Sequence, residues 1–413
     1  MNVIFITLSD INGIKERGIY ADLMRKFRNE GHTVYIVSAA ERRTGMKTHL
    51  MDVDGVHILK VRTLNVQKTN VVEKGIGQLM MEGQFKRAIK KYLGDAQFDL
   101  ILYSTPPITF TNVVRFLKKK NPHAVSYLLL KDIFPQNAVD IGMFGEKSLF
   151  NWYFRRKEVA LYKTSDYIGC MSPANVRFIL EHNDFIEASR VEVAPNSIEV
   201  PLPPKGENFE EEEKAKRAVE RRYIRSKYNL PSNIPIYIYG GNLGKPQGID
   251  FLIKCLNANK DRKDCFFVVV GNGTEYSKLE DWYQNNITDN VKLMKRLPKE
   301  DYDMLVSSCD VGLIFLDHRF TIPNYPSRLL PYLENKMPII CCTDPNTDIG
   351  RIAEENGYGF WCESVKPEDF THILNRMLAS DIKAMGQRGY QFLQDNYTVD
   401  KCYDIIMKHF NHV

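Results

Sequence analysis

The sequence contains no apolar segment that approaches the roughly 20 residues a helix needs to cross a bilayer. Its first residues, MNVIFITLSD, lack the basic region and cleavage site of a secretory signal, and they predict a buried first strand. The eight cysteines include no CxxC pair and no Cys/His ligand spacing. This pattern argues against structural zinc and predicts reduced thiols, so we expect a cytoplasmic protein without a metal site.

The chain as a whole also lacks a strong excess of acidic or basic residues. There are 56 Lys and Arg residues against 51 Asp and Glu, a net charge of +5, and no nucleic-acid recognition motif is present. A nucleic-acid partner is therefore not expected. Residues 1–200, however, carry 28 basic and 21 acidic residues, whereas the remainder carries 28 and 30. Any attraction to an anionic surface is expected in the first half.

Strand-like and helix-like segments alternate along the 413 residues, which is typical of a parallel sheet with helices on both faces. A connection containing Pro201, Pro203, Pro204 and Gly206 interrupts this alternation, and a densely charged, helix-compatible stretch follows it. The α/β pattern restarts at residue 234. The predicted domains are residues 1–200, a charged linker and helix at 201–233, a second α/β domain at 234–395, and a C-terminal helix at 396–413.

Residues 318–342 form the most informative segment. The apolar run VGLIFL precedes a proline-rich loop, and a helix is predicted to begin at Pro326-Ser327-Arg328. Ser327 is a suitable N-cap, and Arg328 adds a fixed positive charge beside free backbone N–H groups. The segment predicts an anion site at the carboxyl edge of a parallel sheet. The alternative is an ordinary strand–helix turn whose arginine is solvated.

Two other strands of the second half end in glycine-rich turns. The loop GGNLGKPQG contains Gly241, Asn242 and Lys245, and GNGTE contains Asn272. The first loop matches neither the P-loop nor the GxGxxG pattern, so each turn has a purely structural alternative. Ligands of open α/β sheets bind at the carboxyl ends of strands, and we expect these residues to converge with Arg328 there.

In the first half, Asp10, Asn12 and Gly18 lie on the loop after the first strand, and a helix starting at Gly18 could approach an anion. Asp132 follows the strand VSYLLL, either as an acid facing a cleft or as a turn residue. The DxD sequence at residues 52–54 is interpreted as a turn and not as a metal site.

Two helices of the first half carry basic residues. Residues 150–162 combine aromatic side chains with Arg155, Arg156 and Lys157, and a second helix carries basic residues at positions 86, 87, 90 and 91. Such helices lie on anionic membranes or are simply exposed surface helices.

Several motifs occur in a fixed order: GHTV, VAPNS, IYGGNLGKPQGID, VVVGNG, CDVGLIFL and PSRLLPYLENKMPII. Together they resemble glycosyltransferase family 4, the retaining GT-B enzymes, and in particular bacterial capsule and O-antigen transferases of the N-acetylfucosamine branch. The resemblance covers the whole chain. It implies a GT-B fold of two Rossmann-like domains facing a cleft, with the C-terminal helix returning to the first domain.

The resemblance also implies an activity. A sugar would pass from a UDP-sugar to a lipid-linked saccharide, without metal or cofactor, at the inner face of the cell membrane. Asn242 stands where the family has a donor-binding Arg and Gln247 where it has a Lys, so Lys245 would supply the charge. The two family glutamates fall on Pro323 and Pro331.

Further positions follow from the same resemblance. Pro326-Ser327-Arg328 matches related branches, and Glu334 would bind ribose hydroxyls. Asp132 lies about where many members carry a His near the transferred sugar. Two other functions are compatible with two Rossmann-like halves, namely a nucleotide-sugar 2-epimerase and a non-catalytic nucleotide-sugar-binding protein.

Overall fold

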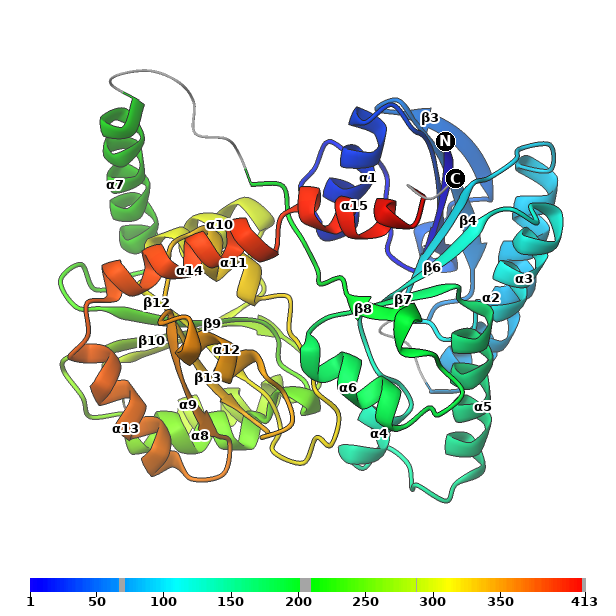
Figure 1. The fold of residues 1–413 in the computed structure, drawn as a ribbon. Coiled ribbons are helices and arrows are strands. Elements are labelled where there is room, and N and C mark those ends of the chain that lie inside the picture. The colour runs from blue at the N-terminus through cyan, green and yellow to red at the C-terminus, as the bar shows by residue number, and fades with distance from the viewer. Residues whose placement is uncertain (67–70, 201–208, 287, 411–413) are drawn as a thin grey trace. The chain divides into compact units, whose positions relative to one another are not determined.

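The computed structural model describes residues 1–66, 71–200, 209–286 and 288–410 (Figure 1). The predicted connection with Pro201, Pro203, Pro204 and Gly206 lies outside the described residues. The chain divides into two compact units. The first contains Met1–Glu199 and Tyr397–Val413, and the second contains Val200–Asn396.

The first unit is built on an eight-stranded sheet with the strand order β3-β4-β2-β1-β5-β6-β7-β8. All neighbouring strands are parallel except the β3–β4 pair. The strands are β1 (Asn2–Thr7), β2 (Thr33–Glu41), β3 (His49–Val53), β4 (Val56–Thr63), β5 (Leu100–Ser104), β6 (Val125–Leu130), β7 (Tyr167–Cys170) and β8 (Val191–Val193). The helices are α1 (Ile19–Asn29), α2 (Val71–Tyr92), α3 (Thr111–Lys120), α4 (Gln136–Asp140), α5 (Leu149–Thr164), α6 (Pro173–Glu181) and α15 (Val399–Met407).

The order in which strands are added to this sheet reverses at β1. From β1 the strands add outward through β2 on one side and through β5 on the other, so the β1–β5 boundary is a topological switch point. The predicted turn at the DxD sequence is confirmed, since Asp54 and Gly55 have φ values of 55° and 75° and join β3 to β4. The strand β3 itself was not predicted. It is short and partly exposed, and its sequence HLMDV alternates only weakly.

The C-terminal helix α15 packs against α1 of the first unit, as expected (Figure 1). The rings of Phe27 and Tyr403 lie 5.0 Å apart, and the Tyr403 hydroxyl is 2.8 Å from Nε2 of His32. Cys402 and Ile406 are buried in the same core as the first strand. Apolar burial therefore returns the last helix to the unit in which the chain begins.

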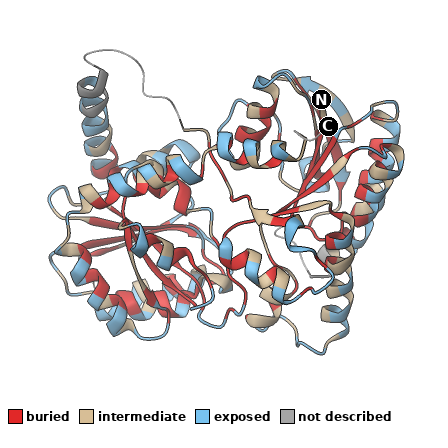
Figure 2. Cartoon of the chain, viewed as in Figure 1, coloured by how far each residue is buried: buried red, intermediate tan, exposed pale blue. Residues whose placement is uncertain are grey.

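The second unit has a six-stranded parallel sheet with the order β11-β10-β9-β12-β13-β14. Its strands are buried, whereas the outer faces of its helices are exposed (Figure 2). The strands are β9 (Ile236–Asn242), β10 (Phe266–Asn272), β11 (Val291–Lys295), β12 (Val311–Phe315), β13 (Ile339–Thr343) and β14 (Gly359–Glu363). The helices are α7 (Phe209–Lys227), α8 (Ile249–Ala258), α9 (Tyr276–Asn285), α10 (Lys299–Ser308), α11 (Leu329–Glu334), α12 (Ile349–Glu355), α13 (Pro367–Leu378) and α14 (Ile382–Asn396).

The strands β9 and β12 separate soon after they meet. Only Tyr237 and Ile238 of β9 pair with β12. Beyond them, the hydroxyl of Tyr332 donates to the Ile238 carbonyl (3.2 Å) and accepts the Gly240 N–H (3.3 Å), so it satisfies the backbone groups that the sheet leaves unpaired. Gly312 makes room for this ring, because a Cβ there would collide with it. This split is the switch point of the second sheet.

The charged helix α7 lies in the segment expected to hold a charged linker and helix, and it packs on α10. Arg225 is buried, donates to the Ser308 carbonyl (3.0 Å) and pairs with Asp310 (2.8 Å). Lys227 pairs with Asp301 of α10 (2.8 Å). The last turns of α7 are therefore part of the second unit.

Candidate active site

The second-sheet edge, defined by the carboxyl ends of β9, β10 and β12, collects most of the predicted donor-binding residues. Gly241 and Asn242 end β9 and pair with Gly271 and Asn272 at the end of β10. Arg328 arrives on the loop after β12, and its guanidinium lies 3.9 Å from the position that a Cβ on Gly241 would occupy. The structure thus brings Gly241, Asn242, Asn272 and Arg328 to one edge.

Arg328 is held by an aromatic ring and not by an acid. Its guanidinium carbon lies 4.4 Å from the ring centroid of Tyr239, which is within the range of a cation–π interaction. Among the residues that the structure describes, no carboxylate forms an ion pair with Arg328, and its Nη1 is buried without a hydrogen-bond partner. The edge therefore carries a positive charge that the described residues leave uncompensated.

Three tyrosines surround this guanidinium, and none of them was singled out by sequence reasoning. Burial raises the pKa of Tyr302 to about 12, and it also raises the pKa values of Tyr239 and Tyr332. The phenols are therefore neutral at physiological pH, and they leave the charge of the guanidinium intact. The sequence marks the positions of Tyr302 and Tyr332 only through two glycines that these rings cover. A Cβ at Gly240 would collide with the ring of Tyr302, and a Cβ at Gly312 would collide with the ring of Tyr332.

The prediction that Ser327 caps a helix is wrong. The helix α11 begins at Leu329, Arg328 occupies the N-cap position, and no side-chain cap is formed. Pro331 explains the shift, because it has no N–H group and must lie among the first three helical residues. With six residues, α11 is also too short to serve as an anion site through its N-terminus alone, so the charge at this edge comes from Arg328.

Glu334 is the last residue of α11, at the end of the helix opposite Arg328. From there the chain leads to the start of β13, at the amino edge of the sheet. The structure therefore does not bring Glu334 into the cluster around Arg328.

The loop after β9 is closed by its own polar residues. Asn242 Nδ2 donates to Gln247 Oε1 (3.0 Å), which also accepts the Gly244 N–H (3.2 Å). Lys245 lies on the short 3₁₀ turn Lys245–Gln247 and is exposed. Asn242 and Gln247, which stand at the two cationic positions of the family, thus bond to each other and shape the loop that presents Lys245.

The first-sheet edge, defined by the carboxyl ends of β1, β5 and β6, contains a cavity of about 590 Å³. Asp10, Asn12 and Gly18 all line it, as do Lys15 and Asp54. The cavity is therefore lined by the loop after β1 and by the β3–β4 turn, which lies at the amino end of β4.

Two acidic residues of this cavity, Asp10 and Asp54, have basic partners. Asp10 forms an ion pair with the fully buried Lys60, whose Nζ also donates to the Ile11 carbonyl (3.0 Å). Asp54 accepts the N–H groups of Ile14 (3.0 Å) and Lys15 (3.3 Å), and this fixes the loop. Asn12 is exposed and lines the cavity.

Asp132 follows β6 at the same sheet edge and is half-buried. Burial raises its pKa to about 6, although Asn137 donates to its Oδ1 (2.7 Å). Its neighbour Lys131 donates to the Ala194 carbonyl (2.9 Å), and burial lowers the pKa of this ammonium to about 8. Thr105 at the end of β5 accepts the N–H of Lys131 (2.9 Å). Two adjacent groups whose charged forms are disfavoured are typical of a functional site.

Only part of the basic face predicted on α5 could contact a membrane. Arg155 pairs with Glu158 and donates to the His182 carbonyl (2.9 Å), so it is a structural residue. Arg156 is exposed and stacks over Trp152, 4.9 Å from the ring centroid. No helix among the described residues has the length and apolarity to cross a membrane.

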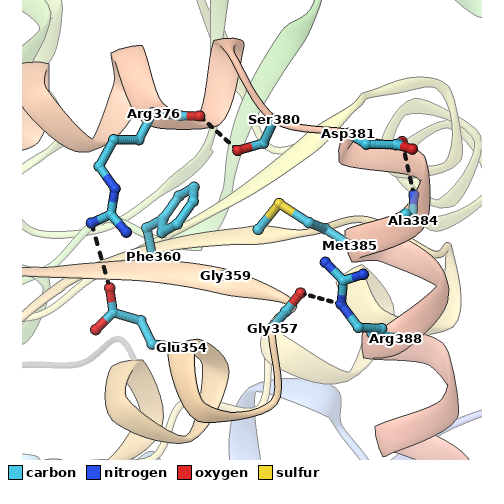
Figure 3. Close-up of a pocket in the computed structure, with 10 residues that line it drawn as sticks. All are labelled: Glu354, Gly357, Gly359, Phe360, Arg376, Ser380, Asp381, Ala384, Met385 and Arg388. Carbon is cyan, nitrogen blue, oxygen red and sulfur yellow. Dashed lines mark hydrogen bonds and ion pairs between the residues drawn. The ribbon is translucent and has the colours of Figure 1, made fainter.

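A second hollow, of about 330 Å³, lies between α12, α13, α14 and the start of β14 (Figure 3). Its arginines are engaged, since Arg376 lies 3.8 Å from Glu354 and stacks on Phe360, and Arg388 donates to the Gly357 carbonyl (2.7 Å). It opens at the amino edge of the sheet, away from the carboxyl ends, and holds none of the predicted residues.

The sequence profile of the family Glycosyl transferases group 1 matches residues 220–392. A curated relative, "Probable glycosyltransferase WbjE" of Pseudomonas aeruginosa, is 21% identical over 339 residues, which cover 80% of this chain and 78% of the relative. The second unit thus carries a glycosyltransferase group 1 domain, and the protein is a transferase enzyme.

Solved structures establish the GT-B architecture. Sucrose-phosphate synthase from Thermosynechococcus elongatus superposes with a TM-score of 0.73 and 13% identity, covering 99% of this chain and 98% of that one. Anabaena HepE in complex with UDP gives a TM-score of 0.67 and 14% identity, with full coverage of both chains. WaaG, a glycosyltransferase of lipopolysaccharide biosynthesis, gives a TM-score of 0.62 and 14% identity, covering 98% and 99%.

Proposed function

We propose that the protein is a retaining, metal-independent glycosyltransferase of family 4. It transfers a sugar from a nucleoside diphosphate sugar to a lipid-linked saccharide in bacterial surface polysaccharide synthesis. The observation that carries this proposal is Arg328, a cation at the switch point of the group 1 domain that forms no ion pair with any acid among the described residues. A UDP-sugar as donor is supported by HepE, which has been solved with UDP and with UDP-glucose. An N-acetylated sugar such as N-acetylfucosamine follows from the sequence resemblance.

Charge development explains the need for Arg328. When the bond between the anomeric carbon and the diphosphate oxygen breaks, the sugar acquires oxocarbenium character and the diphosphate gains negative charge. Preorganised cations lower the free energy of this transition state. We assign that role to Arg328, with Lys245 as a second, exposed cation on the loop after β9.

The first-sheet edge is assigned to the acceptor. The cavity lined by Asp10, Asn12 and Gly18 offers polar groups with balanced charge, which suits the hydroxyl groups of a saccharide. Asp132 is assigned to the reacting acceptor hydroxyl. A carboxyl group with a pKa of about 6 is ionised at neutral pH and accepts the proton as the new glycosidic bond forms.

A nucleotide-sugar panel combined with a transfer assay tests the function. We expect one nucleoside diphosphate sugar to raise the thermal unfolding temperature, because ligand binding stabilises the folded state. Release of the nucleoside diphosphate should then require a lipid-linked saccharide. Epimerised free nucleotide sugar formed without acceptor would instead indicate the epimerase, and donor binding without turnover on any acceptor would indicate a binding protein.

We assign membrane contact to the α5 apolar patch, which consists of Met143, Leu149, Phe150 and Trp152. Leu149 is 83% exposed and Phe150 is 68% exposed, and the other two side chains are also exposed. The exposed cations Lys147 and Arg156 flank the patch. Apolar side chains beside basic residues bind the interface of an anionic bilayer, so the enzyme would lie peripherally at the inner face of the cell membrane.

Vesicle co-sedimentation tests this contact. We expect the double variant Phe150→Ser/Trp152→Ser to lose most of its binding to vesicles rich in phosphatidylglycerol. The variant Val219→Ser/Tyr223→Ser is the matched control, because both residues are 56% exposed on the charged helix α7. Equal sedimentation of the two double variants would remove the assignment.

A further inference from the structure

We propose that Tyr239 is a positioning residue, which holds the Arg328 guanidinium at the second-sheet edge, in its charged and unneutralised form, for a phosphate group of the donor. The inference rests on the proposed function, because it concerns the binding of the donor diphosphate. It assigns a role to a side chain that lies within the motif IYGGNLGKPQGID but was given no function from the sequence.

The hydroxyl of Tyr239 is anchored to the strand on which it lies. It donates its proton to the Asn242 carbonyl (3.0 Å). Because this bond fixes the phenol at the point where β9 reaches the second-sheet edge, it also fixes the ring that contacts Arg328.

The contact between Tyr239 and Arg328 is made by the ring. The guanidinium stacks 4.4 Å from its centroid, and Tyr302 of α10 covers Gly240 on the neighbouring backbone. Tyr239 is itself fully buried between strands, so its ring is fixed by packing. An arginine on a proline-rich loop would otherwise sample many rotamers, and the ring restricts it to one region.

The choice of tyrosine over an acid has a chemical consequence. An aspartate or glutamate in the same place would position Arg328 equally well, but it would neutralise the charge and compete with a phosphate. Burial raises the pKa of Tyr239, so the phenol stays neutral and does not compete. This arrangement positions a cation and still leaves it available to an anion.

Isothermal titration of the full-length protein with UDP, inorganic pyrophosphate and uridine tests the inference. We expect Tyr239→Phe, which keeps the ring, to weaken binding of UDP and pyrophosphate about 5-fold. Tyr239→Leu should weaken it at least 20-fold, because the ring contact is lost as well. Uridine binding should be unchanged in both variants, since uridine has no phosphate.

Tyr237→Phe and Tyr237→Leu are the matched controls. Tyr237 lies two residues earlier on β9, is equally buried, and packs on Phe267 and not on Arg328. Its variants should lose similar thermal stability and yet bind UDP as the wild type does. If Tyr239→Leu is too unstable to purify, the Tyr239→Phe and Tyr237→Phe pair alone decides the question.

The outcomes separate this inference from the proposed function. If the wild type binds UDP and the Tyr239 variants bind it equally well, the positioning role is overturned while the function stands. If the wild type binds pyrophosphate in a Tyr239-dependent manner but takes no nucleotide sugar, the positioning role is supported and the proposed function is lost.

Discussion

The two sheet edges differ in how their charges are balanced. In the cavity beside the first-sheet edge, Asp10 is paired with Lys60 and Asp54 with Lys15. At the second-sheet edge, Arg328 has a tyrosine ring and no carboxylate partner among the described residues. Both edges lie at the switch point of a parallel sheet, so the fold alone does not explain the difference. We infer that a balanced edge suits a neutral saccharide and an unbalanced edge suits a diphosphate.

The largest effect should come from removing the unbalanced charge. Arg328→Ala should lower kcat by about 10²–10³-fold, which is the usual cost of losing one group that stabilises transition-state charge. Arg319→Ala is the matched control, because Arg319 lies on the same loop but is paired with Asp317 (2.8 Å). Steady-state transfer assays measure both. A folded Arg328→Ala enzyme with near-normal turnover would contradict the assignment of the second-sheet edge.

The variant Asp132→Asn tests the first-sheet edge, because it should lower activity and raise stability. Asp132→Asn should lower kcat about 100-fold through loss of the proton acceptor. In the wild type, kcat should fall as the pH drops below about 6, where the carboxylate becomes protonated.

The stability effect of Asp132 follows from the sign of its pKa shift. A raised folded-state pKa favours the protonated form, so its stabilising contribution is present below pH 4 and is lost as the pH rises through about 6. Asp132→Asn should therefore be more stable than the wild type at pH 7.5, by up to about 3 kcal/mol, and equal to it at pH 4. Denaturant unfolding at the two pH values measures this, and equal stability at pH 7.5 would contradict the burial of the carboxyl group.

An added negative charge should affect the two edges differently. Asn242→Asp places a carboxylate beside Gly241 and should raise the donor KM about 5–10-fold, because it repels a diphosphate and competes for the cations. Asn12→Asp makes the same change in the cavity of the first-sheet edge and should alter the acceptor KM less than about 2-fold. Similar changes in both variants would show that charge balance does not distinguish the edges.

The smallest effect should come from the loop that shapes the first-sheet cavity. Asp54→Gly removes the acceptor of two backbone N–H groups, and glycine tolerates the φ of 55° at this position. We expect a loss of about 1 kcal/mol in unfolding free energy and a several-fold rise in acceptor KM, with donor KM unchanged. Asp52→Asn in the same hairpin is the control, since Asp52 contacts His57 and not the loop.

The order of strands and helices could be predicted from local patterns, because buried parallel strands are apolar runs separated by amphipathic helices. The strand at residues 125–130 and the helix at residues 249–258 were predicted with the observed bounds. The strands β3 and β14 and the helix α6 were missed, because they are short and their sequences show weak periodicity. Placing site residues at strand ends also succeeded, since it requires only the direction of each strand.

The partners of these residues could not be predicted. Tyr239 is 89 residues from Arg328 in the sequence, and Lys60 is 50 residues from Asp10. Arg155 seemed available for a membrane from its helix alone, but it is bonded to the end of α6. Such pairings depend on which faces of distant elements pack together, and no local pattern contains that information.

The sequence by itself determined that the chain has two α/β halves with polar and glycine-rich turns at the ends of their strands. It could do so because a buried strand requires apolar residues and a tight turn requires polar residues or glycine, and both requirements act on neighbouring residues. It also contained the reason for the late start of α11, since Pro331 has no N–H group to donate. Only the tertiary structure decided which charges are neutralised. Lys60 meets a carboxylate and Arg328 meets a phenol, and this difference arises from packing between segments that are far apart in the chain.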